Sequence, residues 1–354
     1  MTPEVQAACV GKSPVDSWQT MADLLGLADR VTGQQLFDES EAVLFARFPD
    51  VPALPGALRL LRHLEGAGTL LGLATSSGRR GALQKMSGKG LAPLFRHVVC
   101  GDDVAHAKPA PDVYLRCAEL LGVAPADCLV LEDAPSGVRA AAAAGMRCVV
   151  VPSVRRRESY PETDPGASAG PVQTLTSLLD FRPEEYGLPP FTDTVCGTVP
   201  IRPPWPLRGP VVKGFGRGSK VLGIPTANLA PAALQGSPVG DAVCGIYYGL
   251  AAVGPDPRPR VMAMSIGWNP VFGNDQKTVE PWILHDYGRD FYGEELRLLV
   301  CGYIRPEADF PSLDALVERI REDGRVAERA MAELRDVYDD PFLRPSGAGA
   351  GLET

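Results

Sequence analysis

The hydrophobic pattern of this chain changes most clearly near residue 194. Before that point, apolar runs alternate with amphipathic segments, which predicts parallel strands joined by helices. Beyond it, short apolar segments follow one another with turn residues between them, which predicts a closed antiparallel barrel. The 354 residues are enough for two domains with separate cores. We therefore expect an α/β domain followed by an all-β barrel.

The composition is that of an ordinary globular chain, with 45% apolar residues and a formal charge of −8. The negative charge argues against nucleic acid or an anionic membrane as a partner. No apolar run approaches the length of a membrane span, and the first residues form no secretory signal. The eight cysteines are scattered, without the close spacing of a zinc site. We expect a cytoplasmic protein, a monomer or weak oligomer, that acts on small molecules.

Helical periodicity fills the first part of the chain, residues 1–53. Its apolar residues recur at spacings of three and four, and we expect their faces to be core: Trp18, Met21, Leu24, Leu25, Leu27, Leu36, Val43, Leu44 and Phe48. A helix is expected over residues 58–64. Short apolar strands are then expected over residues 69–74, 98–100, 128–131 and 147–151, with helices between them. Sheets of this kind carry ligands at the carboxyl ends of their strands.

Polar side chains stand at those strand ends: Thr75, Lys108, Glu132 and Asp133. A hydroxyl, an ammonium and two carboxylates could hold a phosphoryl group and Mg²⁺, although each residue alone could equally be a helix cap or a surface group. In this order they resemble the haloacid dehalogenase (HAD) phosphatase superfamily. Thr75 matches its second motif, Lys108 its third, and Glu132 and Asp133 its metal-binding fourth. The opening helices resemble the cap of that superfamily.

The first motif of the superfamily is Asp-x-Asp, which supplies the nucleophile and the general acid/base, and it occurs nowhere in the 354 residues. Without the attacking carboxylate no phosphoenzyme can form, so we expect this HAD remnant to be inactive as given. The strand that carries the motif is central in the superfamily's sheet. Its absence predicts two neighbouring strands with unpaired edges. Two explanations stay open, a degenerate scaffold or a sequence truncated at its start.

Composition also suggests the boundaries. The HAD-like domain is expected over residues 1–180, with a cap over 1–53, an incomplete core over 54–180 and a mobile insertion over 152–171 that lacks apolar periodicity. Residues 172–179 are interpreted as the last helix of this domain. A proline-containing linker is expected over 181–193, the barrel domain over 194–340 and a flexible tail over 341–354.

A glycine-rich stretch, residues 214–228, points to chemistry in the barrel half. Alternate glycines such as Gly214 let the backbone approach a ligand closely, and Lys220 adds a cation, which together suit phosphate. Thr226 and Asn228, one residue apart, offer two oxygen ligands for Mg²⁺. The stretch fits neither the P-loop nor the dinucleotide-binding pattern. The alternative is a plain glycine-rich β-turn.

This stretch resembles the signature of riboflavin kinases, as do four others: Gly245-Ile-Tyr-Tyr-Gly249, Ser265-Ile-Gly-Trp-Asn-Pro270, Lys277-Thr-Val-Glu280 and Asp290-Phe-Tyr-Gly-Glu294. The resemblance covers residues 194–340 and implies a six-stranded antiparallel barrel with a C-terminal helix. The periodicity predicts strands over residues 194–199, 210–213, 245–253, 260–268, 278–284 and 295–303. It predicts a helix over 313–334, with Ser312 as the N-cap.

The resemblance also implies roles for individual residues. Glu280 would take the proton of the riboflavin 5′-hydroxyl as the ATP γ-phosphoryl is transferred; the alternative is a cross-strand salt bridge with Lys277 or Arg297. Implied ATP contacts are Gly214, Lys220, Thr226, Asn228, Ile283, His285 and Tyr292. Thr226 and Asn228 would also hold Mg²⁺, with Zn²⁺ as the alternative metal. Implied flavin contacts are Arg305, Ala308 and Phe310, and residues 269–277 would form a lid.

Three hypotheses follow. The leading one is a riboflavin kinase that makes FMN and carries an incomplete HAD module in front, similar to the kinase/FMN phosphatase fusions of plants and green algae. The second is a bifunctional enzyme whose true N-terminus restores the nucleophile. The third is a flavin-binding protein without activity, against which the intact Thr226, Asn228 and Glu280 argue.

Overall fold

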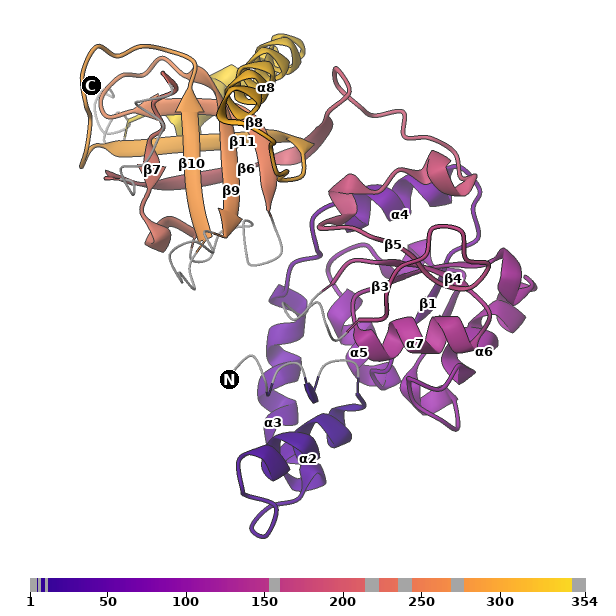
Figure 1. The fold of residues 1–354 in the computed structure, drawn as a ribbon. Coiled ribbons are helices and arrows are strands. Elements are labelled where there is room, and N and C mark those ends of the chain that lie inside the picture. Colours follow the sequence, from indigo (N-terminus) through magenta and orange to yellow (C-terminus); the bar gives the residue numbers. More distant parts are fainter. Residues whose placement is uncertain are drawn as a thin grey trace, which may run out of the picture. The chain divides into compact units, whose positions relative to one another are not determined.

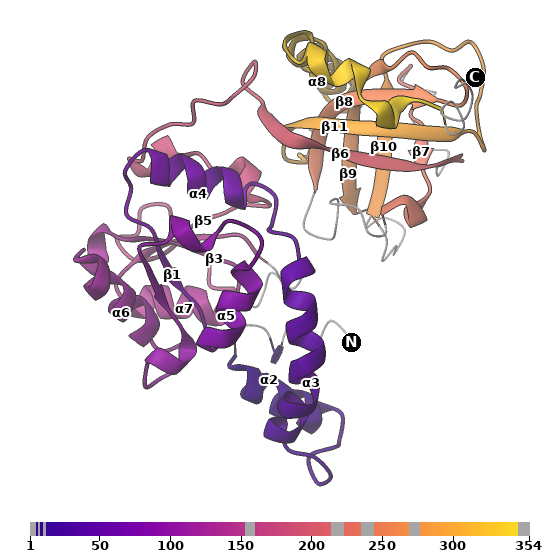
Figure 2. The same ribbon diagram turned by 180° about the vertical axis from the view of Figure 1, so that it is seen from behind.

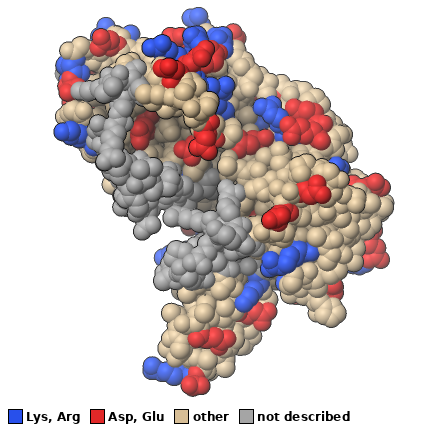
Figure 3. Space-filling view, in the orientation of Figure 1, with Lys and Arg blue, Asp and Glu red and all other residues tan. Residues whose placement is uncertain are grey.

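The computed structural model describes residues 5, 8–9, 12–152, 160–213, 223–234, 244–268 and 277–345. The chain divides into two compact units, Met1–Pro190 and Phe191–Thr354 (Figure 1). Across the described ranges, no helix combines the length and the apolarity needed to cross a membrane. Acidic and basic side chains are interspersed on the face seen in Figure 3, rather than gathered into fields of one sign.

Two helices open the first unit, α2 (Pro14–Leu24) and α3 (Gly33–Arg47). Ser13 caps α2 with its side chain, and Thr32 forms a capping box at the start of α3. The helices are therefore where periodicity predicted them. The expectation that their apolar faces are core is wrong for several side chains, which are between 36% and 59% exposed: Leu24, Leu25, Val43 and Leu44.

An α/β core follows, with helices and strands alternating as predicted. Its elements are α4 (Ala57–Gly66), β1 (Gly72–Ala74), α5 (Arg79–Met86), β2 (His97–Val99), α6 (Asp112–Leu121), β3 (Leu129–Glu132), α7 (Pro135–Ala143), β4 (Arg147–Val150) and β5 (Gly170–Thr174). All of its strand pairs are parallel. Helices α6 and α7 lie side by side on these strands (Figures 1 and 2), and side chains from both enter one buried cluster.

The strands of this core form two separate sheets, β1–β2 and β3–β4–β5. In the part of the chain that is described, no strand pairs with the second edge of β1 or of β3. The two sheets nevertheless share one core, since the buried cluster includes Val99 of β2 and Val130 of β3, with Ala74 of β1 packed against it. This is the arrangement predicted from the missing Asp-x-Asp strand.

Residues 172–179 were expected to be helical, and this prediction is wrong. They contain most of β5 and a 3-10 turn, Leu178–Asp180. β5 pairs in parallel with β4, and Val172 is only 5% exposed. A short apolar window fits either period, and the free edge of β4 decides in favour of a strand. Of the expected mobile insertion, residues 153–159 lie outside the described ranges.

The second unit is a six-stranded antiparallel sheet in the order β10–β9–β8–β11–β6–β7. The strands are β6 (Val199–Val212), β7 (Asn228–Leu229), β8 (Gly245–Val253), β9 (Arg260–Trp268), β10 (Lys277–Ile283) and β11 (Glu295–Arg305). Its first and last members come together, because the Ala227 N–H donates to the Pro281 carbonyl at 2.9 Å. The sheet is thus a nearly closed barrel, and the prediction of a six-stranded barrel is confirmed.

Two of the six predicted strands are replaced by one long strand in the structure. Residues 194–199 and 210–213 were expected as separate strands, but β6 runs unbroken from Val199 to Val212 through five prolines. Proline lacks an N–H and is tolerated on a strand edge that donates nothing. β6 pairs with β11 on one side and reaches β7 only at Val211 and Val212, so most of its other edge is free. The sixth strand is β7, which the sequence prediction missed.

Helix α8 (Leu313–Glu333) covers part of the outside of the barrel (Figures 1 and 2). Ser312 caps it as predicted, since its hydroxyl accepts from the Ala315 N–H at 3.2 Å. The buried face of the helix packs against β8, β9 and β11 through Ala327, Ala330 and Met331. Because β8 faces α8 on one side and the barrel interior on the other, it is buried almost throughout.

The barrel unit continues past its expected end at residue 340. Pro341–Leu343 forms a 3-10 helix, and Leu343 is 2% exposed. The Leu343 carbonyl accepts from Nε of the buried Arg297 at 3.1 Å. Residues 341–343 therefore belong to the barrel rather than to a flexible tail, while residues 346–354 lie outside the described ranges.

Candidate active site

A row of side chains crosses the outer face of the barrel sheet. Strand pairing places Arg305 of β11 opposite Ile246 of β8, and Ile246 opposite Ser265 of β9. Ser265 is in turn opposite Glu280 of β10. The chain neighbours of these residues point inward, as Tyr247 does with 0% exposure, so the alternation of a strand directs the row outward. We call these four residues the outer row.

Thr226 and Asn228 extend the outer row beyond Glu280. The hydrogen bond from Ala227 to Pro281 sets β7 beside β10. Ala227 is buried, so Thr226 and Asn228 project to the same face as Glu280. Neither side chain hydrogen-bonds to another described residue. A hydroxyl and an amide oxygen beside a carboxylate are the oxygen ligands that Mg²⁺ prefers, so these residues fit that ion.

Glu280 is half-buried, and its side chain also has no partner among the residues that the structure describes. No hydrogen bond or ion pair joins its carboxylate to a residue that the structure describes. Arg297, one alternative partner, is 1% exposed and bonds to Glu295 and to backbone carbonyls. Lys277, the other, is buried on the inward alternation of β10, opposite to Glu280. The salt-bridge alternative therefore has no support, which leaves a carboxylate available for proton transfer.

Arg305, at the far end of the outer row, is already paired. Its Nε and Nη2 donate to the two carboxylate oxygens of Asp323 on α8, at 3.0 and 2.7 Å. Asp323 is 2% exposed, and the Arg305 guanidinium lies 5.6 Å from the centre of the Phe310 ring. Arg305 thus fixes the loop after β11, which contains the two other implied flavin contacts, the exposed Ala308 and the half-buried Phe310.

The remaining implied nucleotide contacts differ in their surroundings. Ile283 is 6% exposed in the barrel core, whereas His285 and Tyr292 are exposed on the connection between β10 and β11. This connection is held by edge-to-face rings, with His285 4.8 Å and Phe291 5.1 Å from Tyr287. Burial raises the pKa of Tyr287. Gly214, Lys220 and residues 269–276 of the expected lid lie outside the described ranges, while its last residue, Lys277, is the first residue of β10.

In the first unit, the structure brings the HAD remnant residues together at the ends of β1 and β3. Lys108 Nζ lies 3.4 Å from the Ala74 carbonyl of β1 and 3.0 Å from Glu132 Oε2 of β3. The Tyr114 hydroxyl donates to the same Glu132 oxygen at 2.5 Å. Burial first, and the Glu132 carboxylate second, raise the pKa of Tyr114. Lys108 therefore bridges the two sheets at the edges of β1 and β3 that face no other described strand.

Thr75 and Asp133 stand on either side of this bridge. Thr75 follows the last residue of β1, and its hydroxyl accepts from the Ser77 N–H at 3.1 Å. Asp133 follows Glu132 and is exposed, and its carbonyl accepts from the Tyr160 hydroxyl at 2.5 Å. A hydroxyl, an ammonium and two carboxylates thus gather at one sheet edge as predicted, but in the described chain no Asp-x-Asp faces them.

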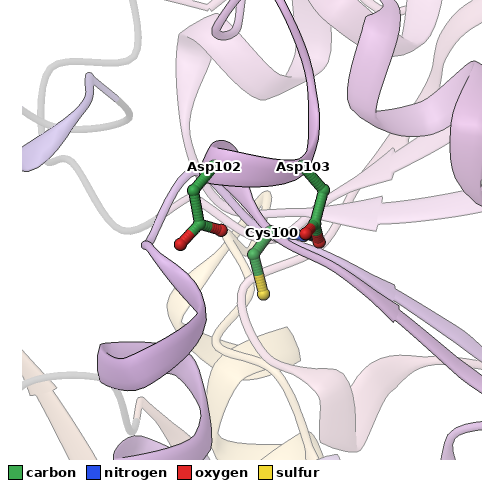
Figure 4. A group of neighbouring side chains, drawn as sticks. All are labelled: Cys100, Asp102 and Asp103. Carbon is green, nitrogen blue, oxygen red and sulfur yellow. Dashed lines mark hydrogen bonds between the residues drawn. The ribbon is translucent and has the colours of Figure 1, made fainter.

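A second acidic group in this unit is accounted for by its own contacts. Cys100, Asp102 and Asp103 converge after β2, as Figure 4 shows. Asp102 accepts from the Arg79 N–H at 2.9 Å, and Asp103 pairs with the Arg79 guanidinium at 2.5 Å. These carboxylates anchor the start of α5, which suffices to explain their placement.

Three residues of these sites gave no signal in the sequence. Tyr114 and Asp323 look like ordinary helix residues, because their partners lie far away along the chain. Glu307 lies between Arg305 and Ala308, in a loop where a carboxylate is unremarkable. Only the folded chain shows that its carboxylate lies against Gly267 of β9.

Comparison with known proteins agrees with this two-part structure. A riboflavin kinase (flavokinase) family model matches residues 201–331, and a haloacid dehalogenase-like hydrolase model matches residues 2–151. The chain is 44% identical over 145 residues to the riboflavin kinase of Mus musculus, covering 40% of this chain and 92% of that protein. It is 39% identical over 196 residues to the mitochondrial (DL)-glycerol-3-phosphatase 1 of Arabidopsis thaliana, covering 54% of this chain and 63% of that protein.

One relative spans both units. The bifunctional riboflavin kinase/FMN phosphatase of Arabidopsis thaliana is 44% identical over 338 residues, which cover 94% of this chain and 86% of that protein. Its name combines riboflavin kinase, which the first family model also names, with FMN phosphatase. The chain belongs to the family of bifunctional riboflavin kinase/FMN phosphatases.

Proposed function

We propose that the barrel unit is an ATP-dependent riboflavin kinase that makes FMN. The observation that carries this proposal is the outer row. In it the Glu280 carboxylate, which has no partner among the described residues, lies between the side chains of Thr226 and Asn228 on one side and the loop after β11 on the other. Strands lie about 4.8 Å apart, so Glu280 and Arg305, three strand steps apart, are about 14 Å apart along the row. That span leaves room for an elongated substrate on the outer face of the sheet.

The proposed reaction joins the 5′-oxygen of riboflavin to the γ-phosphorus of ATP. The bond from that phosphorus to the β,γ-bridging oxygen breaks, and ADP leaves. Glu280 accepts the hydroxyl proton as the new bond forms. Thr226 and Asn228 would hold Mg²⁺, which neutralises charge on the transferred phosphoryl group. Because these residues lie on adjacent strands with Glu280, binding alone can bring the hydroxyl and the phosphate together.

The first prediction is that the protein forms FMN from riboflavin, ATP and Mg²⁺. Product is separated by chromatography and detected by its fluorescence. Formation should stop when EDTA removes the metal and resume when Mg²⁺ is restored, because the phosphates need the ion. Zn²⁺ in place of Mg²⁺ tests the alternative metal. Binding of riboflavin and ATP without any FMN would instead favour the flavin-binding hypothesis.

We infer a second function, FMN phosphatase, for a form of the first unit that carries an Asp-x-Asp strand. Two observations favour it. The Lys108, Tyr114 and Glu132 cluster is assembled at the strand ends, and β1 and β3 each have beside it an edge that pairs with no strand in the described ranges. A strand added there would gain backbone hydrogen bonds on both sides and would end beside Lys108. It would supply the nucleophile that the sequence lacks.

The second prediction is that adding a strand restores hydrolysis. An apolar segment ending in Asp-x-Asp, fused before Met1, should give FMN hydrolysis that its own first Asp→Asn variant lacks. The chain without the addition should release no more phosphate from FMN than its Asp133→Asn variant does. Hydrolysis by the unextended chain that Asp133→Asn abolishes would show that another nucleophile acts, and the inference would be wrong.

A further inference from the structure

The carboxylate of Glu307 lies against the barrel beside the outer row. A Cβ at position 267 would overlap Glu307 Oε1, so the carboxylate occupies the space into which a side chain at this position would project. Gly267 pairs with Thr278, while Ser265, two residues before it, pairs with Glu280. Two residues along a strand span about 7 Å. The Glu307 carboxylate therefore lies about one such step from the proton acceptor, on the same face of the sheet.

This carboxylate is open to a ligand, and no side chain or backbone group of the described chain donates a hydrogen bond to it. Glu307 is exposed as a residue, and its carboxylate makes no hydrogen bond or ion pair with another described residue. Burial raises the pKa of the Glu307 carboxyl, although the charges of Lys277 and Arg305 act in the opposite direction. Donors from a bound ligand would therefore stabilise its charged form.

The position of the Glu307 carboxylate decides which hydrogen-bond donors of the proposed substrates can reach it. A riboflavin with its 5′-hydroxyl at Glu280 and its ring toward Phe310 places the ribityl chain between them, next to Gly267. The ribityl hydroxyls are donors, whereas ATP phosphates are acceptors and would be repelled by a carboxylate. The imide N–H of the ring lies on the side of the ring away from the ribityl chain, so it points away from Glu280.

We propose that Glu307 binds the ribityl hydroxyls of riboflavin and makes the kinase selective for flavins with a polyol side chain. This proposal rests on the proposed riboflavin kinase function. Glu307 is a specificity residue here, since it orients the chain that carries the reacting hydroxyl. Gly267 shares this role, because only a residue without a side chain leaves room for the carboxylate.

The test compares riboflavin with a flavin whose N10 substituent is 5-hydroxypentyl, which keeps the ring and the terminal hydroxyl but lacks the three other hydroxyls. Glu307→Gln should lower kcat/KM for riboflavin by about 10-fold, mainly through KM, because a charged hydrogen bond becomes a neutral one. The value for the hydroxypentyl flavin and the KM for ATP should stay within about twofold. Gly267→Ala should give the same pattern by displacing the carboxylate. The double variant should be no worse than either single one.

The control is Asp309→Asn, which removes an exposed carboxylate from the same loop and should leave the preference for riboflavin unchanged. Dissociation constants of both flavins, from quenching of flavin fluorescence, give the same comparison without turnover. If the kinase proposal fails but the ribityl assignment holds, the protein will form no FMN and will still bind riboflavin more tightly than the hydroxypentyl flavin. Equal loss for both flavins in Glu307→Gln, or an unchanged preference, would overturn the ribityl assignment.

Discussion

Replacing Glu280 with glutamine is expected to lower kcat for FMN formation by about 10²–10⁴-fold, the usual contribution of a general base. The amide keeps the size of the carboxylate but cannot accept the proton. Because Glu280 makes no ion pair with a described residue, its removal breaks no structural contact among them. Riboflavin binding and the unfolding midpoint should both be retained. Single-turnover measurement of FMN formation, alongside flavin fluorescence quenching, separates the chemical step from binding.

Glu318→Gln is the matched control, because Glu318 is an exposed carboxylate on α8 that is not part of the outer row. It should retain the activity of the unchanged protein. A Glu280→Gln variant that forms FMN at the normal rate would show that the substrate hydroxyl loses its proton elsewhere. Glu280 would then be at most a residue that orients the substrate.

Replacing Asp323 with asparagine is expected to destabilise the barrel unit by about 3–5 kcal/mol. The change leaves the Arg305 guanidinium without its bidentate partner in a buried region, where the side chains of Arg305 and Asp323 are 12% and 3% exposed. It also removes the second ion pair of Asp323, with Arg319 at 3.3 Å. The midpoint of the barrel's thermal transition should fall by about 10 °C, since about 1 kcal/mol shifts a unit of this size by about 2–4 °C. Calorimetry of the whole chain measures it.

Glu322 is the neighbouring control. Its carboxylate pairs with Arg325 and Arg329 on the exposed side of α8, so Glu322→Gln should leave the midpoint nearly unchanged. The double variant Arg305→Met with Asp323→Leu should recover much of the lost stability, because no buried charge is left unpaired. If Asp323→Asn were as stable as Glu322→Gln, the ion pair between Arg305 and Asp323 would not stabilise the barrel, and the prediction would be wrong. The Arg305 guanidinium would then be available to bind an anionic ligand.

Local periodicity was sufficient to predict most elements of the fold. Strands β8, β9 and β11 and helix α8 fall within about two residues of their predicted bounds, because each has a long apolar face of one period. The failures are short segments. Residues 172–179 became β5, and the proline-rich β6 was predicted as two pieces, since the neighbouring strand decides both outcomes.

The candidate site divides in the same way. Glu280, Thr226 and Asn228 stand in contiguous motifs, so a family resemblance is enough to single them out. That they share one face follows only from the strand pairing and from the bond between Ala227 and Pro281. The exposed Leu24 and Leu25 show the converse limit, because a helical period identifies an apolar face without saying what covers it.

The sequence by itself determined the two fold classes, the motifs for phosphoryl transfer and the lack of an Asp-x-Asp nucleophile, because periods, spacings and residue types are local properties. Only the tertiary structure decided that the first sheet is split in two, that Arg305 is paired with Asp323, and that Glu307 lies over Gly267. These features join residues far apart in the chain. Their free energy depends on strand register and burial, which no window of sequence contains.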